Sequence, residues 1–370
     1  MNIVVIREKL KEGLDAVSRA GGETSQLPVL KNVLLETKKN KLELTATNLE
    51  LAITYSVLGK VIEDGKTTVS SALFQGLINA LQSERINMNA KNNILEIKAD
   101  NYKAKINGTS SEEFPIIPKI KNKTRFIEME SGLLKEVLSQ VAAATQFSEI
   151  RPELNTVFFS YKTDSLIFAA TDSFRLAEKT ISEKQFKSTF EAGFTCLLPL
   201  KTVNELIRIL KDEGAVKIYK DENQVLLETE QWECISRLSE GIFPDYKQII
   251  PKKFTSEIVL EKAEFGNAVR LTSVLSSRIN EVVIKLHEGQ KAIEIFSAGE
   301  SSGENDYLLS AKITGKFKPI SFNWKYLTDG LKALKTNEVH LGLNEDNKPC
   351  ELRSPNDPSF FYILMPILKA

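Results

Sequence analysis

The chain has 370 residues, of which 42% are hydrophobic and 26% are charged, a composition typical of globular proteins and unlike that of disordered or collagen-like chains. Because one hydrophobic core usually organises about 100 to 150 residues, this length predicts two or three domains. Lys and Arg together number 49, as do Asp and Glu, so the formal net charge is zero. This balance excludes a bulk electrostatic attraction to nucleic acid or membrane. A polyanion would therefore have to bind at a local patch of positive charge.

Six elements are predicted in the first third of the chain: strand, helix, hairpin, strand, helix and hairpin. The strand at residues 2–6 leads into a helix whose apolar stripe is Leu10, Leu14 and Val17. Apolar runs on either side of residues 38–41 predict the first hairpin. The remaining elements are a strand at Thr68-Val69, a helix with the stripe Leu73, Leu77 and Leu81, and a hairpin across Asp100-Asn101.

The same elements return twice in the same order. The second copy has a strand at 126–129, helix stripes at Leu133, Val137, Val141 and at Val203, Leu206, Leu210, a strand at 196–198, and hairpins across 162–165 and 230–231. The third copy has a strand at 257–260, helix stripes at Phe265, Val269 and at Leu327, Leu331, Leu334, a strand at 320–322, and hairpins across 287–290 and 355–358. Such a repeat predicts α+β domains, in each of which two helices cover one face of an antiparallel sheet. Short segments rich in Lys and Pro near 118–123 and 251–254 mark the boundaries, which gives predicted domains at 1–120, 125–250 and 253–370.

Three similar domains that dock in the same way generate a rotation, which either closes into a ring or continues as a filament. The six expected helical windows hold more basic than acidic residues, so the helices would form the positive lining of a ring. Lysine-bearing helix faces are also common on ordinary solvated surfaces, and the charge alone therefore leaves DNA binding open. A weak, diffuse positive surface would nevertheless suit a protein that encloses duplex DNA, because firm phosphate contacts would hinder sliding and depend steeply on salt.

Four motifs carry a resemblance to a known family: Leu27-Pro28-Val29-Leu30, Thr171-Asp172-Ser173-Phe174-Arg175-Leu176-Ala177, Gly241-Ile242-Phe243-Pro244-Asp245-Tyr246 and Tyr362-Ile363-Leu364-Met365-Pro366-Ile367. With them the chain resembles the bacterial DNA polymerase III beta subunits, the sliding clamps, over all three domains. The resemblance implies a processivity factor of DNA replication that forms a head-to-tail homodimer and encircles duplex DNA independently of sequence. It also implies that helices line the hole and sheets form the outer wall, and that the replicative polymerase, the clamp loader and repair proteins are partners.

The resemblance further implies a hydrophobic cleft between the second and third domains that binds short linear peptides. Its matching residues are Leu154, Thr171, Phe174, Arg175, Leu176, Pro244, Lys247, Ile363, Leu364, Met365, Pro366 and Ile367. An apolar cleft with a methionine wall can adapt to different peptides, and few polar groups then suffice to fix their direction. The run at 360–364 is also typical of a core strand, whose alternate residues would face core and cleft. Ser173, Phe174 and Gln248 depart from the family pattern and leave the peptide preference open.

Candidates for contact with the duplex are basic residues in or near the expected helices and loops: Arg19, Arg151, Lys201, Arg208 and Arg278. Each could equally be a surface or ion-pair residue. A phosphate contact known in the family is not expected in the first helix-to-strand loop, where this chain has Thr24.

At the dimer interface, the first helix of the third domain is expected to meet the edge strand of the partner's first domain. This places Val274 and Leu275 against Ala104 and Ile106, although ordinary core packing would explain the same residues. The sheet would then continue across the join and cover an exposed edge.

Other classes of protein fit the sequence less well. His287 and His340 have no nucleophile motif beside them, and no Gly-x-x-x-x-Gly-Lys phosphate loop is present, so we expect no catalysis. The three cysteines, Cys196, Cys234 and Cys350, lack paired spacing, which argues against disulfides and a zinc site. With no apolar run of about 18 to 20 residues and no signal peptide, we expect a cytoplasmic protein without metal or cofactor. A repeat scaffold that binds peptides without encircling DNA remains the alternative.

Overall fold

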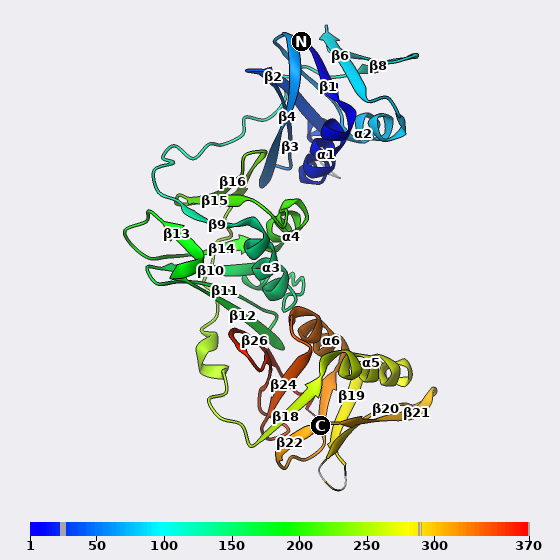
Figure 1. Ribbon diagram of the computed structural model, residues 1–370, viewed down its shortest axis with the longest axis vertical. Coiled ribbons are helices and arrows are strands. Elements are labelled where there is room, and N and C mark those ends of the chain that lie inside the picture. The colour runs from blue at the N-terminus through cyan, green and yellow to red at the C-terminus, as the bar shows by residue number, and fades with distance from the viewer. Residues whose placement is uncertain (23–26, 288, 290, 369–370) are drawn as a thin grey trace. The chain divides into compact units, whose positions relative to one another are not determined.

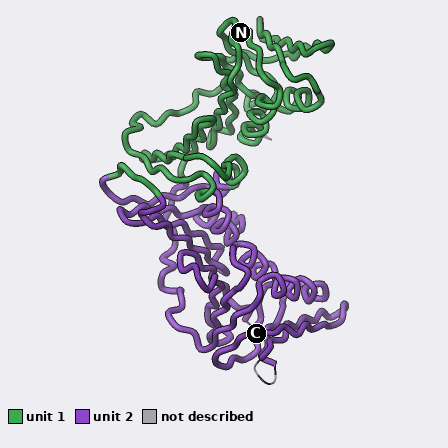
Figure 2. The backbone as a smooth tube through the Cα atoms, in the orientation of Figure 1, with its two compact units in different colours: residues 1–134, 186–190, 204–238 green, residues 135–185, 191–203, 239–370 purple. Residues whose placement is uncertain are grey.

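The computed structural model describes residues 1–22, 27–287, 289 and 291–368. Thr24 and part of the 287–290 turn therefore lie outside the described residues. The chain divides into two compact units (Figure 2): unit 1 consists of residues 1–134, 186–190 and 204–238, and unit 2 of residues 135–185, 191–203 and 239–370. Within the described ranges, no helix is both long enough and apolar enough to span a membrane.

The order of elements repeats three times (Figure 1). Each copy consists of a strand, a helix and a three-stranded meander, followed by a second strand, helix and meander. The first copy comprises β1 (Asn2–Ile6), α1 (Arg7–Val17), β2 (Asn32–Lys38), β3 (Lys41–Thr47), β4 (Leu51–Glu63), β5 (Lys66–Ser70), α2 (Ser71–Ala80), β6 (Arg85–Lys91), β7 (Ile94–Ala99) and β8 (Tyr102–Asn107).

The other two copies follow the same order, with one short extra strand each, β13 and β22. The second comprises β9 (Ile127–Glu130), α3 (Ser131–Ala142), β10 (Thr156–Lys162), β11 (Ser165–Thr171), β12 (Arg175–Ser182), β13 (Phe186–Ser188), β14 (Phe194–Pro199), α4 (Leu200–Ile209), β15 (Ala215–Lys220), β16 (Gln224–Glu228) and β17 (Trp232–Arg237). The third comprises β18 (Ser256–Glu261), α5 (Lys262–Thr272), β19 (Glu281–Leu286), β20 (Ala292–Gly299), β21 (Gly303–Ser310), β22 (Lys312–Gly315), β23 (Ile320–Asn323), α6 (Trp324–Ala333), β24 (Glu338–Leu343), β25 (Cys350–Ser354) and β26 (Asp357–Leu364).

The pairing of strands repeats with the order of elements. The first strand of each copy pairs with the strand after the second helix, as in β1 with β6, β9 with β15 and β18 with β24. The first strand of the first meander pairs with the strand before the second helix, as in β2 with β5, β10 with β14 and β19 with β23. The α+β fold with antiparallel sheets, predicted from the repeat, is confirmed.

The hydrophobic pattern predicted the meanders only in part and the buried face of α2 wrongly. The six expected hairpins are present as antiparallel pairs. Each belongs to a three-stranded meander, and third strands such as β12 were missed because polar residues interrupt their apolar pattern. Lys179 in β12, for example, is buried, and its Nζ pairs with Asp357 Oδ2 at 3.1 Å. In α2 the structure buries Phe74 and Ile78, whereas Leu73 of the predicted stripe is 66% exposed. This helix is apolar on neighbouring faces, and periodicity alone cannot say which of them meets the sheet.

Helix α1 packs on β3 and β4, and helix α5 packs on β18, β20 and β21, whereas linkers cover part of other sheet faces. In unit 1, Gly13 of α1 leaves room for Tyr55 and Val57 of β4. Ala52 alternates with these residues along β4, so it points to the other face. There it packs with Ile120 of the linker that follows β8. The linker therefore covers the place where β4 pairs with β17.

Unit 2 repeats this arrangement. Tyr246, which lies in the linker after β17, packs on Leu176 of β12 and Ile363 of β26. Leu176 and Ile363 are direct partners in the antiparallel pair of β12 and β26. This pair carries the site described next.

Candidate functional site

A cavity of about 140 Å³ lies in unit 2 beside the end of the β12–β26 pair. Its apolar side includes Leu176, Ile363, Met365 and Ile249. The complete lining is Arg151, Thr171, Ser173, Phe174, Arg175, Leu176, Pro244, Asp245, Tyr246, Ile249, Ile363 and Met365. A concave apolar surface with a few polar groups at its rim is typical of sites that bind small ligands or peptide side chains.

One wall of the cavity is the tight turn between β11 and β12. Thr171 Oγ1 donates to the carbonyl oxygen of Arg175 at 2.7 Å. Asp172 Oδ1 accepts from the backbone amides of Phe174 at 3.0 Å and Arg175 at 3.1 Å. An aspartate that caps the amides two and three residues on favours such a turn. Ser173 at its centre adopts the left-handed conformation, with φ of 81°, and the ring of Phe174 is left exposed.

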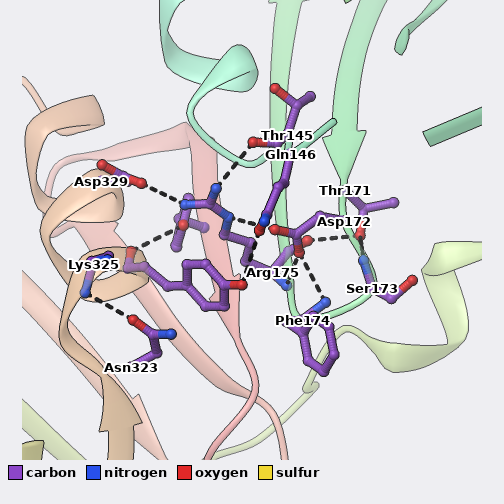
Figure 3. A network of polar contacts seen from close by, with 12 residues as sticks. Thr145, Gln146, Thr171, Asp172, Ser173, Phe174, Arg175, Asn323, Lys325 and Asp329 are labelled. Carbon is purple, nitrogen blue, oxygen red and sulfur yellow. Dashed lines mark hydrogen bonds and ion pairs between the residues drawn. The ribbon is translucent and has the colours of Figure 1, made fainter. Parts of the chain in front are cut away.

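Arg175 connects this turn to α6 and to the segment that follows α3 (Figure 3). Its Nε donates to Asp172 Oδ2 at 2.8 Å, its Nη1 to Asp329 Oδ2 of α6 at 2.6 Å, and its Nη2 to the carbonyl oxygen of Thr145 at 3.0 Å. The guanidinium carbon also lies 4.3 Å from the ring centre of Tyr326. Burial opposes the charged form, but the neighbouring Tyr362, Asp329 and Asp172 raise the pKa of Arg175 above its ordinary value. The guanidinium is therefore a charged and internally bonded part of the wall.

The opposite wall comes from the linker after β17, which contains the short helix η5 (Tyr246–Ile249). The hydroxyl of Tyr246 donates to Glu178 Oε2 of β12. Burial, together with this bond, raises the pKa of Tyr246, so its hydroxyl stays protonated. Phe243 stacks on Phe158 of β10 with ring centres 5.2 Å apart. These contacts hold the linker against the sheet and make the cavity a preformed feature of the fold.

Seven of the twelve residues predicted for the peptide cleft line this cavity: Thr171, Phe174, Arg175, Leu176, Pro244, Ile363 and Met365. The other five lie elsewhere in the described part of the chain. Leu154 and Leu364 are fully or almost fully buried, Pro366 is buried, Ile367 is partly buried, and Lys247 is exposed on η5. Leu364 alternates with Ile363 along β26 and therefore faces away from the cavity.

The prediction missed four lining residues, Ser173, Asp245, Tyr246 and Ile249. Three of them belong to the linker, whose single helical turn gives no periodic signal. Arg151, predicted as a DNA contact, also lines the cavity, where its Nη1 donates to Ser173 Oγ at 2.8 Å and its Nε pairs with Glu153 Oε1 at 3.1 Å.

The other predicted duplex contacts are exposed. Lys201 and Arg208 lie on α4, and Arg208 Nη1 pairs with Glu205 Oε1 at 2.7 Å. Arg19 lies in the short helix after α1, and Arg278 follows η6 (Ser273–Leu275).

The residues predicted for the dimer interface lie on β8 and η6. Ala104 is half-buried and Ile106 is buried, and both belong to β8. On η6, Val274 is 74% exposed, whereas Leu275 is half-buried.

Among the residues that the structure describes, no three His, Cys, Asp or Glu side chains are grouped closely enough to hold a metal ion.

Comparisons with known proteins cover nearly the whole chain. Family models of the DNA polymerase III beta subunit match residues 1–118 (N-terminal domain), 128–245 (central domain) and 247–368 (C-terminal domain). A beta sliding clamp of Synechocystis is 29% identical over 99% of both chains. Crystal structures of a sliding clamp from Bacillus subtilis and of a DNA polymerase III beta subunit from Thermotoga maritima cover all of this chain at 25% identity, with TM-scores of 0.93 and 0.91. Three successive domain models and a fold shared along its entire length show that the chain belongs to the DNA polymerase III beta subunit family, the beta sliding clamps.

Proposed function

We propose that two copies of this chain form a ring that encircles duplex DNA and holds the replicative polymerase on it, without catalysing a reaction. The observation that carries this proposal is the threefold repeat, in which each copy matches one domain model of the same family. The matched ranges also support the domains that we propose at 1–120, 125–250 and 253–370. Work on replicating DNA would place the protein in the bacterial cytoplasm.

The repeated strand pairing supports a head-to-tail dimer. In two places the last strand of a first meander pairs with the last strand of a second meander: β4 with β17, and β12 with β26. Two such last strands have no partner of this kind within the described part of the chain: β8, which ends a second meander, and β21, which ends a first meander. Each of them is the end strand of its sheet. Pairing β8 of one copy with β21 of the other would extend the rule and cover both edges in a closed assembly.

Side chains on these two edges support the same pairing. The exposed face of β8 carries Lys103 and Lys105, and that of β21 carries Glu304 and Asp306. Opposite charges on paired strands favour one alignment over others. Exposed apolar side chains beside the helices support the same dimer. In unit 2 the first helix of the second copy, α3, contacts the second helix of the third copy, α6, since Gln140 Nε2 donates to the carbonyl oxygen of Ala333 at 2.9 Å. At the proposed dimer join the equivalent helices are α5 of one copy of the chain and α2 of the other. Val274, next to α5, and Leu73 of α2 are both exposed and apolar.

Encirclement can be tested by loading the protein with its clamp loader on nicked circular DNA and then cutting the circle. A ring should slide off the new ends, so we expect the protein to be released after the cut and retained on uncut circles. A peptide-binding scaffold or a groove-binding protein would stay bound to both forms. Retention on linear DNA would contradict the proposed ring.

The individual contacts with the duplex stay predictions. They are Arg19, Arg151, Lys201, Arg208 and Arg278.

We further propose that the cavity beside β12 and β26 binds apolar side chains of short linear peptides from the polymerase, the clamp loader and repair proteins. Met365 supports this, because its flexible side chain lines the cavity and is only partly buried. Met365→Ala should weaken binding of a fluorescent peptide from the polymerase tail at least tenfold, as measured by anisotropy. Leu368→Ala, three residues further on and exposed, is the control and should bind normally. Equal affinities of the two variants would remove the assignment.

A further inference from the structure

Arg175 lines the cavity, yet its hydrogen-bonding capacity is directed into the protein. Three of its nitrogens donate to Asp172, Asp329 and the carbonyl oxygen of Thr145. Its side chain is only 6% exposed. A ligand could bind the guanidinium only by breaking these bonds, so the side chain fits a role in building the wall rather than in binding a ligand directly.

The three anchors of Arg175 come from different places. Asp172 belongs to the same turn, and Thr145 follows α3 in the same copy of the repeat. Asp329 alone comes from the third copy, where it lies on α6. The ion pair of Arg175 with Asp329 therefore connects the turn to a helix of another domain. A charged pair with N···O of 2.6 Å is among the stronger side-chain contacts.

Tyr326 connects the ion pair of Arg175 and Asp329 to the exposed ring of Phe174. It precedes Asp329 by three residues on α6, so both side chains lie on one face of the helix. One contact of its ring is the guanidinium of Arg175 at 4.3 Å, and another is the ring of Phe174, stacked at 6.4 Å with 24° between the planes. The Tyr326 hydroxyl donates to Gln146 Oε1 at 3.1 Å. Phe174 and Arg175 therefore both contact α6 through Tyr326.

We propose that Asp329 is a positioning residue of the peptide site. Acting through Arg175, it holds the 171–175 turn and Phe174 in the shape that receives an apolar peptide side chain. Asp329 is not among the residues that line the cavity, so its effect on binding is indirect. This inference rests on the proposed binding of peptides.

The primary test is the affinity of the full-length protein for the fluorescent polymerase-tail peptide. Asp329→Ala should weaken binding about tenfold, because Arg175 loses the ion pair that connects it to α6. Asp329→Asn should have a smaller effect, since the amide oxygen can still accept from Nη1 without the charge. Lys332→Ala, which removes an exposed side chain three residues further along α6, is the matched control and should bind like the unmodified protein.

A double-mutant cycle separates positioning from a general loss of stability. Arg175→Lys keeps the positive charge and removes the planar fork. If Asp329 acts through Arg175, Asp329→Ala should add little to the loss already caused by Arg175→Lys. Additive losses would overturn the proposal, and so would normal affinity of Asp329→Ala. Thermal unfolding should change little in Asp329→Ala, because Asp329 is 39% exposed and Arg175 keeps two anchors.

A second readout needs no peptide. Fluorinated phenylalanine at position 174 gives a ¹⁹F resonance that reports on the rim itself. We expect this resonance to move or broaden in Asp329→Ala and to stay unchanged in Lys332→Ala. An unchanged resonance in both variants would overturn the positioning role. If the unmodified protein fails to bind the peptide, the proposed peptide site fails first and this inference fails with it, whereas loss of binding confined to Asp329→Ala supports both.

Discussion

Ser173 and Leu49 occupy the same position in two copies of one turn. Leu49 has φ of 76° and Ser173 has φ of 81°. Thr47 Oγ1 donates to the carbonyl oxygen of Leu51 at 2.8 Å, as Thr171 Oγ1 does to that of Arg175 at 2.7 Å. The first and second copies of the repeat therefore share this turn. What distinguishes the copy beside the cavity is the charged Arg175 in place of Leu51.

The left-handed backbone at Ser173 should cost free energy that glycine would avoid. We expect Ser173→Gly to be more stable than Ser173→Ala by about 1 kcal/mol in chemical denaturation. Both variants lose the hydroxyl that accepts from Arg151 Nη1, so their difference isolates the backbone conformation. Equal stabilities would show that the turn is not strained at this position.

Strand β25 places a carboxylate on the face of its sheet that the linker after β17 covers. Glu351 is only 6% exposed, and its Oε1 has no hydrogen-bond partner among the described residues. The guanidinium of Arg353 lies beside it, with Nε 3.4 Å from Oε1. Burial raises the pKa of Glu351 above 4.5, and nearby Glu257 adds to this, although Arg353 opposes it.

This raised pKa predicts a pH dependence of stability. Above pH 4.5 the unfolded chain has largely lost the proton that Glu351 still holds in the folded state. The free energy of unfolding should therefore fall as the pH rises from 4.5 through the raised pKa of Glu351 in the folded state. Glu351→Gln removes the titrating group and should be more stable than the unmodified protein by about 1 kcal/mol at neutral pH. The advantage should disappear near pH 4 in urea denaturation. Glu338→Gln, an exposed carboxylate on neighbouring β24, should show no such change, and a constant advantage at every pH would refute the assignment.

Elements with a clear hydrophobic period could be predicted, whereas those with mixed surfaces could not. Helix α4 buries Val203 and Leu206, as its pattern indicated. Strand β21 was missed because only one of its residues, Leu309, is buried. The linker helix η5 was missed for another reason, since a single turn has no period and its burial depends on packing against β12 and β26.

The whole molecule repeats one joining rule, and the proposed dimer extends it to a partner. Val274 is suited to test this because it is exposed in the single chain. Val274→Asp should fold normally and sediment as a monomer, since the carboxylate would be buried unpaired in the dimer. Ile242→Asp introduces the same charge at an exposed apolar position of the linker and should leave the dimer intact. A dimeric Val274→Asp variant would contradict the interface.

The threefold repeat, the class of fold and the family could be recognised in the linear chain, because they depend on periodicity and on short motifs that survive without knowledge of contacts. The composition of the cavity could not be derived in this way. Arg151 and Asp329 lie 178 residues apart, and no local pattern indicates that both act on one turn, one through Ser173 and the other through Arg175. Such contacts arise only when the chain folds, because strand pairing and linker packing bring together side chains whose spacing along the sequence carries no signal.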